Sequence, residues 1–281
     1  MLEAEAGDIA YGRTPVVEAA SLSIAQGEIC ALCGPNGAGK TSLFAALAGE
    51  LRPRRGVVRI GGEDIRKLSA VALAERRAVL EQSPTLSAEF SVRELIGLAI
   101  PLQIPPEEAE EIVETTIAEV DLAEYAARSV LRLSGGQRHR AHLGRALAQL
   151  AAGRALGHTT SLLLDEPTAN LDIAHQIAVM HLANRAAARG AAVAVVLHDL
   201  NLAAAFADRI ALMAKGRIIA AGAPSEVFTA RRLSETYGTD LSVQIGSDDR
   251  PRITPRYDVT PAQTSKEIPH VHRHEPLSRP S

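Results

Sequence analysis

The chain has 281 residues, with 30 Lys and Arg against 33 Asp and Glu, a formal net charge of −3, and 46% apolar but only 3% aromatic residues. This length corresponds to one large domain or two smaller ones, with enough chain to bury a substantial core. The negative charge argues against a dedicated nucleic-acid-binding protein, and the shortage of aromatic residues disfavours stacking on single strands. We expect no nucleic-acid partner, because binding to nucleic acid would require a local basic patch.

Apolar runs are short, and the run over residues 95–102 is interrupted by Gly97 and Pro101, far below the roughly 20 residues that a membrane span needs. The N-terminus is acidic and has no basic segment followed by an apolar one, so no secretory signal is visible. We therefore expect a cytoplasmic protein. Cys30 and Cys33 have a CxxC spacing, but the predicted strand around them points them to opposite faces, which favours two small buried side chains.

In chain order, short strand-like runs come first, at residues 8–11, 21–24, 28–32 and 57–60, with a helical pattern at 43–48 after a Gly-rich loop. Helical periodicity dominates residues 91–152. After residue 161 strands and helices alternate: strand 162–164, helix 173–189, strand 192–197, a helix through 206, and strand 210–214, which a tight turn joins to 217–220. This alternation predicts an α/β protein.

The last 35 residues differ in composition, because six of the 15 prolines and few large apolar residues lie there. We predict that residues 247–281 form a tail that is mobile at least past Tyr257. His270, His272 and His274 alternate along it and could bind a transition metal or haem iron, but an unstructured, mildly cationic tail is the favoured interpretation.

Residues 34–41 fit the pattern GxxxxGK[ST] between a predicted strand and a predicted helix. Glycines let backbone N–H groups surround a phosphate, the lysine reaches the β- and γ-phosphates, and the threonine offers a hydroxyl to Mg²⁺. Our nucleotide-binding candidates are these residues and the serine that follows them: Gly34, Pro35, Asn36, Gly37, Ala38, Gly39, Lys40, Thr41 and Ser42. This loop alone leaves GTPases, kinases and several ATPase families open.

A second anion-binding element decides among them. Leu133 is followed by Ser134, Gly135, Gly136 and Gln137 at the start of a predicted helix, where backbone amides attract phosphate. One phosphate loop already serves one triphosphate, so this element needs a second ligand or a second subunit. Here the sequence resembles the ATP-binding subunit of an ABC transporter, whose LSGGQ signature closes over ATP held by the opposite protomer.

The resemblance implies roles for further residues. Asp165 and Glu166 end a strand in LLLDE, where Asp165 would organise Mg²⁺ and Glu166 would polarise the attacking water. Asp172 lies in the loop that crosses the dimer interface. Gln82 would contact Mg²⁺, sense the γ-phosphate and couple to the membrane partner, while His198 would hold the γ-phosphate. Taken singly, such residues are more often structural, but six motifs in the family's order make coincidence negligible.

The aromatic Tyr11 is the weakest of these assignments. It stands where the family places the ring that stacks on adenine, and as an isolated residue it could equally pack in the core. His139 departs from the family's usual glutamine after the signature, but the signature itself is intact.

The resemblance implies a P-loop NTPase cassette at residues 1–246, with a RecA-like core, an antiparallel β subdomain and a helical signature subdomain at about 83–152. It also implies ATP and Mg²⁺, a homodimer, two transmembrane permease subunits, and a position on the cytoplasmic face of the bacterial inner membrane. A second phosphate loop is missing, and Lys40 and Ser134 are too close in sequence for a long coiled coil between them. These features exclude the fused and DNA-repair branches of the family.

The cargo rests on similarity alone. Residues 197–228 are similar to cassettes for iron chelates, vitamin B12 and haem, while LDIAHQ at 171–176, the helix at 140–150 and the extra residues 151–160 resemble haem importers. We expect an ATPase for haemin import, served indirectly by a periplasmic haem-binding protein. The alternatives are a siderophore or cobalamin importer and a soluble ABC ATPase that acts on nucleic acid or on protein assembly.

Overall fold

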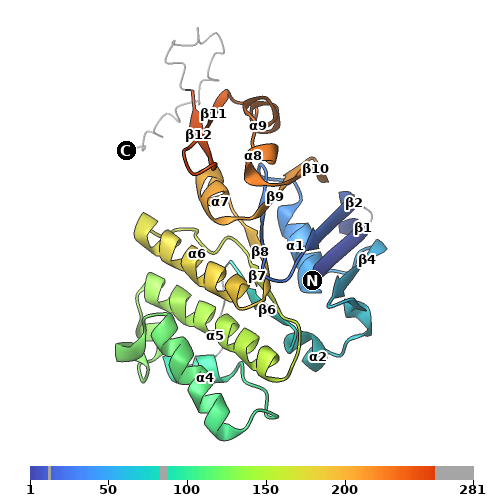
Figure 1. Cartoon of the computed structure of the whole chain (residues 1–281). Coiled ribbons are helices and arrows are strands. Elements are labelled where there is room, and N and C mark those ends of the chain that lie inside the picture. Colours follow the sequence, from blue (N-terminus) through green and yellow to red (C-terminus); the bar gives the residue numbers. More distant parts are fainter. Residues whose placement is uncertain (12–13, 83–87, 257–281) are drawn as a thin grey trace, which may run out of the picture.

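The computed structural model describes residues 1–11, 14–82 and 88–256. The described residues form three sheets, and helices lie on both faces of the largest one (Figure 1). The three alternating histidines of the tail and the first residues of the expected helical subdomain, 83–87, lie outside the described residues. In the described part, no helix is long and apolar enough to cross a membrane.

The central sheet has the strand order β10-β9-β3-β8-β7-β6. All its neighbours pair in parallel except β10, which forms an antiparallel hairpin with β9. The strands are β3 (Ile29–Cys33), β6 (Arg77–Leu80), β7 (Ser161–Leu164), β8 (Ala192–Val196), β9 (Arg209–Ala214) and β10 (Arg217–Gly222). Every residue of β3, β7 and β8 is buried, because helices or the second sheet cover both faces of a parallel sheet.

A smaller antiparallel sheet has the order β2-β1-β4-β5. Its strands are β1 (Leu2–Tyr11), β2 (Thr14–Ile24), β4 (Arg55–Ile60) and β5 (Glu63–Asp64). Helix α1 (Lys40–Ala48) lies between the two sheets, where Leu43, Phe44 and Leu47 join one apolar core with side chains of both. This core fixes the helix that follows the phosphate-binding loop.

Helices form the part of the chain between β6 and β7, as the periodicity predicts. The elements from β5 to β7 are α2 (Ala70–Ala74), α3 (Val92–Gly97), α4 (Pro106–Glu119) and α5 (Gly135–Ala155), with short 3₁₀ turns at Ile65–Lys67, Ala123–Tyr125 and Val130–Arg132. Helix α5 packs on α3 and α4 and also contacts β6 and β7, so it joins the helical part to the central sheet. Helix α6 (Ile173–Ala188) then covers one face of that sheet (Figure 1).

The C-terminal part corrects the predicted boundary at residue 246. Helices α7 (Leu200–Phe206), α8 (Pro224–Val227) and α9 (Ala230–Tyr237) precede a hairpin of β11 (Leu241–Ile245) and β12 (Pro251–Pro255). The boundary falls between the two paired strands, and Ile253 of β12 is buried in the main core. The prolines misled the prediction, because an edge strand accepts proline where a central strand does not.

The two cysteines confirm the strand interpretation. Cys30 and Cys33 are both buried and free, and they belong to different apolar cores on opposite sides of β3. Burial raises the pKa of Cys30 to about 12 and that of Cys33 further still. Neither thiol is therefore reactive at neutral pH.

Helix α5 packs closely on the end of α2, which generates a stability prediction. A Cβ at Gly153 would lie 2.1 Å from the carbonyl oxygen of Glu75. We expect Gly153→Ala to lower the free energy of unfolding by about 1–3 kcal/mol, because two backbone segments must separate. In the control Gly97→Ala, the Cβ would lie 3.9 Å from Val113 Cγ2, an ordinary contact. Equal urea midpoints for the two variants would contradict this packing.

Candidate nucleotide-binding and hydrolysis site

The phosphate-binding loop connects β3 to α1. Gly34 has a φ of 146°, and a Cβ there would lie 2.2 Å from the carbonyl oxygen of Met213, so only glycine fits. Gly39 precedes α1 with a φ of 96°, and a Cβ there would meet Val17 Cγ2 at 2.9 Å. The loop therefore keeps its backbone N–H groups at the start of α1, where a helix attracts anions.

Lys40, the first residue of α1, is buried and folds back over the loop. Its Nζ donates hydrogen bonds to the carbonyl oxygens of Gly34 at 2.8 Å and Pro35 at 3.1 Å. Burial lowers its pKa, while the nearby carboxylates of Glu166 and Asp165 act in the opposite direction. The ammonium group thus lies inside the predicted phosphate cradle. Of the next two residues, Thr41 is exposed and Ser42 is buried.

Asp165 directly follows β7, and its backbone N–H donates to Leu80 O at 2.9 Å. Its Oδ1 is buried and has no hydrogen-bond partner among the described residues. Burial raises the pKa of this carboxyl to about 6, with further contributions from Glu166 and Glu50, while His198 and Lys40 lower it. A carboxylate that is desolvated and unpaired in this way is suited to a cation.

Glu166 lies at the centre of the site, in a left-handed backbone conformation with a φ of 48°. Its Oε2 accepts a hydrogen bond from Gln82 Nε2 at 2.7 Å, and its Oε1 lies 2.6 Å from His198 Nε2. Because a carboxylate only accepts, His198 Nε2 carries the proton in this contact. Strained backbone of this kind is concentrated at functional sites, where the surrounding structure holds it.

The sheet order explains why these three residues meet. Gln82, Glu166 and His198 follow β6, β7 and β8, which are parallel neighbours in the central sheet. Their carboxyl ends lie at the same edge, where open α/β sheets place ligands. The structure therefore brings together the phosphate loop, both carboxylates, Gln82 and His198.

The signature residues lie elsewhere in the chain. Ser134 begins α5 in a capping box: its Oγ accepts from Gln137 N at 3.3 Å, and Gln137 Oε1 accepts from Ser134 N at 3.0 Å. This fixes the start of α5 as predicted, with Gly135 and Gly136 in its first turn. Among the described residues, no hydrogen bond or ion pair joins 134–137 to the phosphate loop. One chain thus holds two separate elements that are predicted to bind anions.

Asp172 begins α6 beside the signature. Its Oδ1 accepts from His175 N at 2.9 Å and lies 2.8 Å from His175 Nδ1, and these bonds lower the pKa of the carboxyl. A Cβ at Gly136 would lie 3.8 Å from His175 Nε2, so the start of α6 packs against the signature turn.

Two further predictions concern single residues. Tyr11 ends β1, but its side chain lies outside the described structure, so adenine stacking stays a prediction. His139, in the second turn of α5, is largely buried, which lowers its pKa, and it lies near the backbone of Pro167 in the loop after Glu166.

Sequence reasoning missed two acidic residues of this region. Asp199 begins α7 directly after His198 and accepts hydrogen bonds from Asn201 N at 2.8 Å and Leu202 N at 3.0 Å. An Asp before a helical pattern is a recognisable helix-start signal and could have found it. Glu50 acts on Asp165 only through the fold, so no sequence signal identifies it.

Comparisons with known proteins agree with this geometry. The sequence model of the ABC transporter family matches residues 17–169. The chain is 44% identical over 245 residues to the hemin import ATP-binding protein HmuV of Pseudomonas entomophila, covering 87% of this chain and 95% of that protein. It is 41% identical over 254 residues to the protein of the same name from Rhodopseudomonas palustris, covering 90% and 94%.

The comparison with solved structures concerns the fold. A solved dimeric bacterial ABC transporter cassette has a TM-score of 0.68 with this chain at 24% identity, covering 79% of this chain and 98% of that one. The chain belongs to the ABC transporter family of ATP-binding, ATP-hydrolysing proteins.

Proposed function

We propose that this protein is the ATP-hydrolysing subunit of an importer that moves haemin across the bacterial inner membrane. The observation that carries the ATPase assignment is the Glu166 carboxylate, which lies between Gln82 and His198 at the sheet edge that also carries the phosphate loop. The cargo is supported by relatives named as hemin import proteins that match nearly their full length.

The phosphate loop supports binding of a nucleoside triphosphate. Residues 34–42 supply backbone N–H groups at the start of α1, and Lys40 needs only to exchange two carbonyl partners for phosphate oxygens. Tyr11 at the end of β1 is proposed to stack on the adenine ring.

The acidic residues of the site fit Mg²⁺. Asp165 presents an unpartnered buried oxygen, and the hydroxyl of Thr41 and the amide oxygen of Gln82 are the further oxygen ligands in this proposal. When bound, Mg²⁺ would neutralise negative charge on the triphosphate while the γ-phosphoryl group is transferred to water. Burial, together with Glu166 and Glu50, raises the pKa of Asp165, which supports a cation beside this carboxyl.

Hydrolysis then follows from the position of Glu166. For a water to enter, one of the two hydrogen bonds to this carboxylate must open, and Glu166 accepts the proton as the water oxygen attacks the γ-phosphorus. The bond between the γ-phosphorus and the β–γ bridging oxygen breaks, and ADP leaves. His198 Nε2, which carries a proton, stabilises the oxygens of the transferring group.

A second copy of the chain completes each nucleotide site in this proposal. Ser134 and Gln137 bond to each other at the start of α5, which leaves the backbone N–H groups of Gly135 and Gly136 to face a phosphate, and Asp172 lies at the same surface. A two-fold dimer would bring each signature to the partner's phosphate loop. A solved relative in this fold is described as dimeric.

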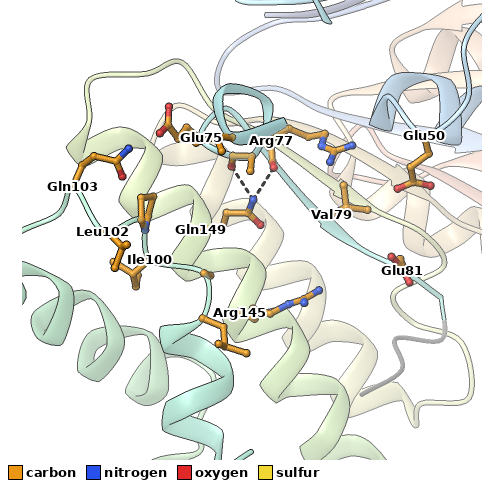
Figure 2. Close-up of a pocket in the computed structure, with 15 residues that line it drawn as sticks. Glu50, Glu75, Arg77, Val79, Glu81, Ile100, Leu102, Gln103, Arg145 and Gln149 are labelled. Carbon is orange, nitrogen blue, oxygen red and sulfur yellow. Dashed lines mark hydrogen bonds between the residues drawn. The ribbon is translucent and has the colours of Figure 1, made fainter. Parts of the chain in front are cut away.

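A groove beside Gln82 is the proposed docking surface for the permease. It has a volume of about 640 Å³ and lies between the segment 71–81 and the segment 98–103 (Figure 2). Val71, Leu98 and Leu102 are exposed apolar side chains in its walls. Gln149 of α5 donates hydrogen bonds to Ala74 O at 2.7 Å and Arg77 O at 3.1 Å, which hold one wall in place.

This arrangement connects transport to hydrolysis. The groove includes Glu81, and the next residue, Gln82, donates a hydrogen bond to Glu166. A docked permease segment that moves Glu81 would therefore shift Gln82 relative to the Glu166 carboxylate. We place the protein on the cytoplasmic face of the membrane, bound to two permease subunits, with haemin delivered from outside by a periplasmic binding protein.

Replacing the proposed general base tests the hydrolytic step. Glu166→Gln keeps the shape of the side chain but removes proton acceptance, so we expect the rate of ATP turnover to fall about 100-fold or more while ATP still binds. Steady-state phosphate release and equilibrium binding of ATP measure the two effects. The exposed Glu235 of α9 provides the control Glu235→Gln. Turnover by Glu166→Gln at the unmodified rate would refute the assignment.

The raised pKa of Asp165 predicts a pH-dependent stability. The folded protein holds this proton more tightly than the unfolded chain, whose ordinary pKa is 3.8, so stability falls as the pH rises from about 4 through about 6. In EDTA and without nucleotide, Asp165→Asn should therefore melt at a higher temperature than the unmodified protein at pH 7.5, and the difference should disappear towards pH 4.

The neighbouring Asp172 is the matched control, because its pKa is lowered rather than raised. Asp172→Asn should give no stabilisation at pH 7.5. A melting-temperature difference for Asp165→Asn that does not depend on pH would contradict the electrostatic explanation.

The cargo is tested in vesicles that contain the chain and the membrane protein that co-purifies with it. We expect uptake of haemin that requires ATP and stops with Glu166→Gln in the same complex. Uptake of a ferric siderophore or cobalamin instead of haemin would replace the cargo assignment. ATP turnover stimulated by DNA, without any membrane partner, would overturn the transport function itself.

A further inference from the structure

The C-terminal hairpin contacts the helix that begins directly after His198. Helix α7 starts at Leu200, two residues after this histidine, and β12 packs against it (Figure 1). The other side of His198 is fixed by the central sheet, where Leu197 N donates to Leu32 O at 3.2 Å. The backbone at His198 is therefore held between β8 and the start of α7.

The His198 side chain itself has little packing to hold it. About half of its surface, 49%, is exposed, and its only hydrogen bond among the described residues is the one to Glu166. Its imidazole position consequently depends on the backbone on either side. Since β8 is fully buried, the start of α7 is the adjustable side.

Asn201 joins the start of α7 to the hairpin. Its backbone N–H donates to the Asp199 carboxylate that begins the helix, at 2.8 Å. Its side chain forms two bonds with one residue of β12: Nδ2 donates to Ile253 O at 2.9 Å, and Oδ1 accepts from Ile253 N at 2.8 Å. Ile253 is anchored in turn, because its side chain is 94% buried in the main core, with 6% exposed.

Arg250 joins the other end of the same helix to the hairpin. Its Nη1 donates to Ala204 O at 3.1 Å and to Ala207 O at 2.5 Å, so the guanidinium binds the free carbonyl groups where α7 ends. Helix α7 has only seven residues, too few to be stable by itself. Both of its ends are thus held by residues that belong to, or bond with, the hairpin.

We propose that the hairpin β11–β12 is part of the hydrolytic machinery, because Asn201 and Arg250 fix α7 and thereby the position of His198 Nε2 at Glu166. Asn201 and Arg250 are positioning residues in this proposal, and the inference rests on the role proposed above for His198. A displacement of about 1 Å at a catalytic group can cost up to about 100-fold in rate. Loss of the two hydrogen bonds between Asn201 and Ile253 would allow such a displacement of His198, and its effect on the rate is therefore measurable.

A double-mutant cycle on the full-length protein tests this role. We expect Asn201→Ala to lower kcat for ATP about tenfold with little change in KM, because the phosphate loop is untouched. In a His198→Ala background the same substitution should change kcat less than about twofold, since the group it positions is gone. The control Asn184→Ala removes an asparagine of α6 that has no side-chain hydrogen bond among the described residues, and it should leave kcat unchanged.

Arg250→Ala provides a second, independent variant at the far end of α7, in case Asn201→Ala does not fold. It should lower kcat several-fold, again only when His198 is present, and Arg252→Ala, an exposed arginine two residues further along in β12, is its control. Equal losses of kcat with and without His198 would show a general structural role and overturn the proposal, as would an unchanged kcat in both variants. If His198→Ala itself keeps full turnover, the proposed role of His198 fails, and this inference fails with it.

Discussion

The parallel pairing of β6, β7 and β8 is the constraint on which the site depends. Leu80 pairs with Leu164, and Leu164 with Val195, so the three strands end at nearly the same level. The chain then leaves the sheet within three residues on each strand, which brings Gln82, Glu166 and His198 within hydrogen-bond distance. The register of buried backbone hydrogen bonds thus sets the geometry of the exposed polar groups.

Electrostatics give this geometry its chemical character. Asp165 and Glu166 lie near Lys40, and Glu166 and Glu50 act on the carboxyl of Asp165, whose burial makes this repulsion stronger than it would be in water. A site of this kind is destabilised without cations, and a magnesium–triphosphate complex supplies both a cation for the carboxylates and an anion for the loop. The same charges that cost stability therefore provide affinity for the proposed substrate.

The helical part and the C-terminal hairpin lie outside the sheet edge that carries Gln82, Glu166 and His198, but both are connected to it. The helical part carries the signature at the start of α5 and one wall of the groove beside Gln82. The C-terminal hairpin holds the helix that follows His198. Both residues that contact the central carboxylate are in this way connected to a separate surface of the protein, Gln82 to the proposed permease groove and His198 to the hairpin.

The sequence by itself determined the local elements and the identity of the chemistry. Short-range signals identify three of these elements. The loop at residues 34–41 has glycines where the backbone conformation is open only to glycine, the start of α5 has a capping pattern, and the strand before Asp165 is a continuous apolar run. The family resemblance drawn from them is confirmed by relatives that are 41% and 44% identical. The central strands were also predicted, except β6, which has only four residues, two of them half-buried.

Tertiary structure alone decided the contacts between segments far apart in the chain. The bonds from Gln82 and His198 to Glu166, the effect of Glu50 on Asp165 and the attachment of Asn201 to Ile253 join residues far apart in the chain, up to 115 positions for Glu50 and Asp165, for which no local pattern exists. The same reason explains the boundary placed wrongly at residue 246. Six prolines and few large apolar residues after residue 246 indicated a tail. Pairing with β11 and burial of Ile253 nevertheless stabilise residues 251–255 as a strand, and both depend on neighbours that the local composition does not reveal.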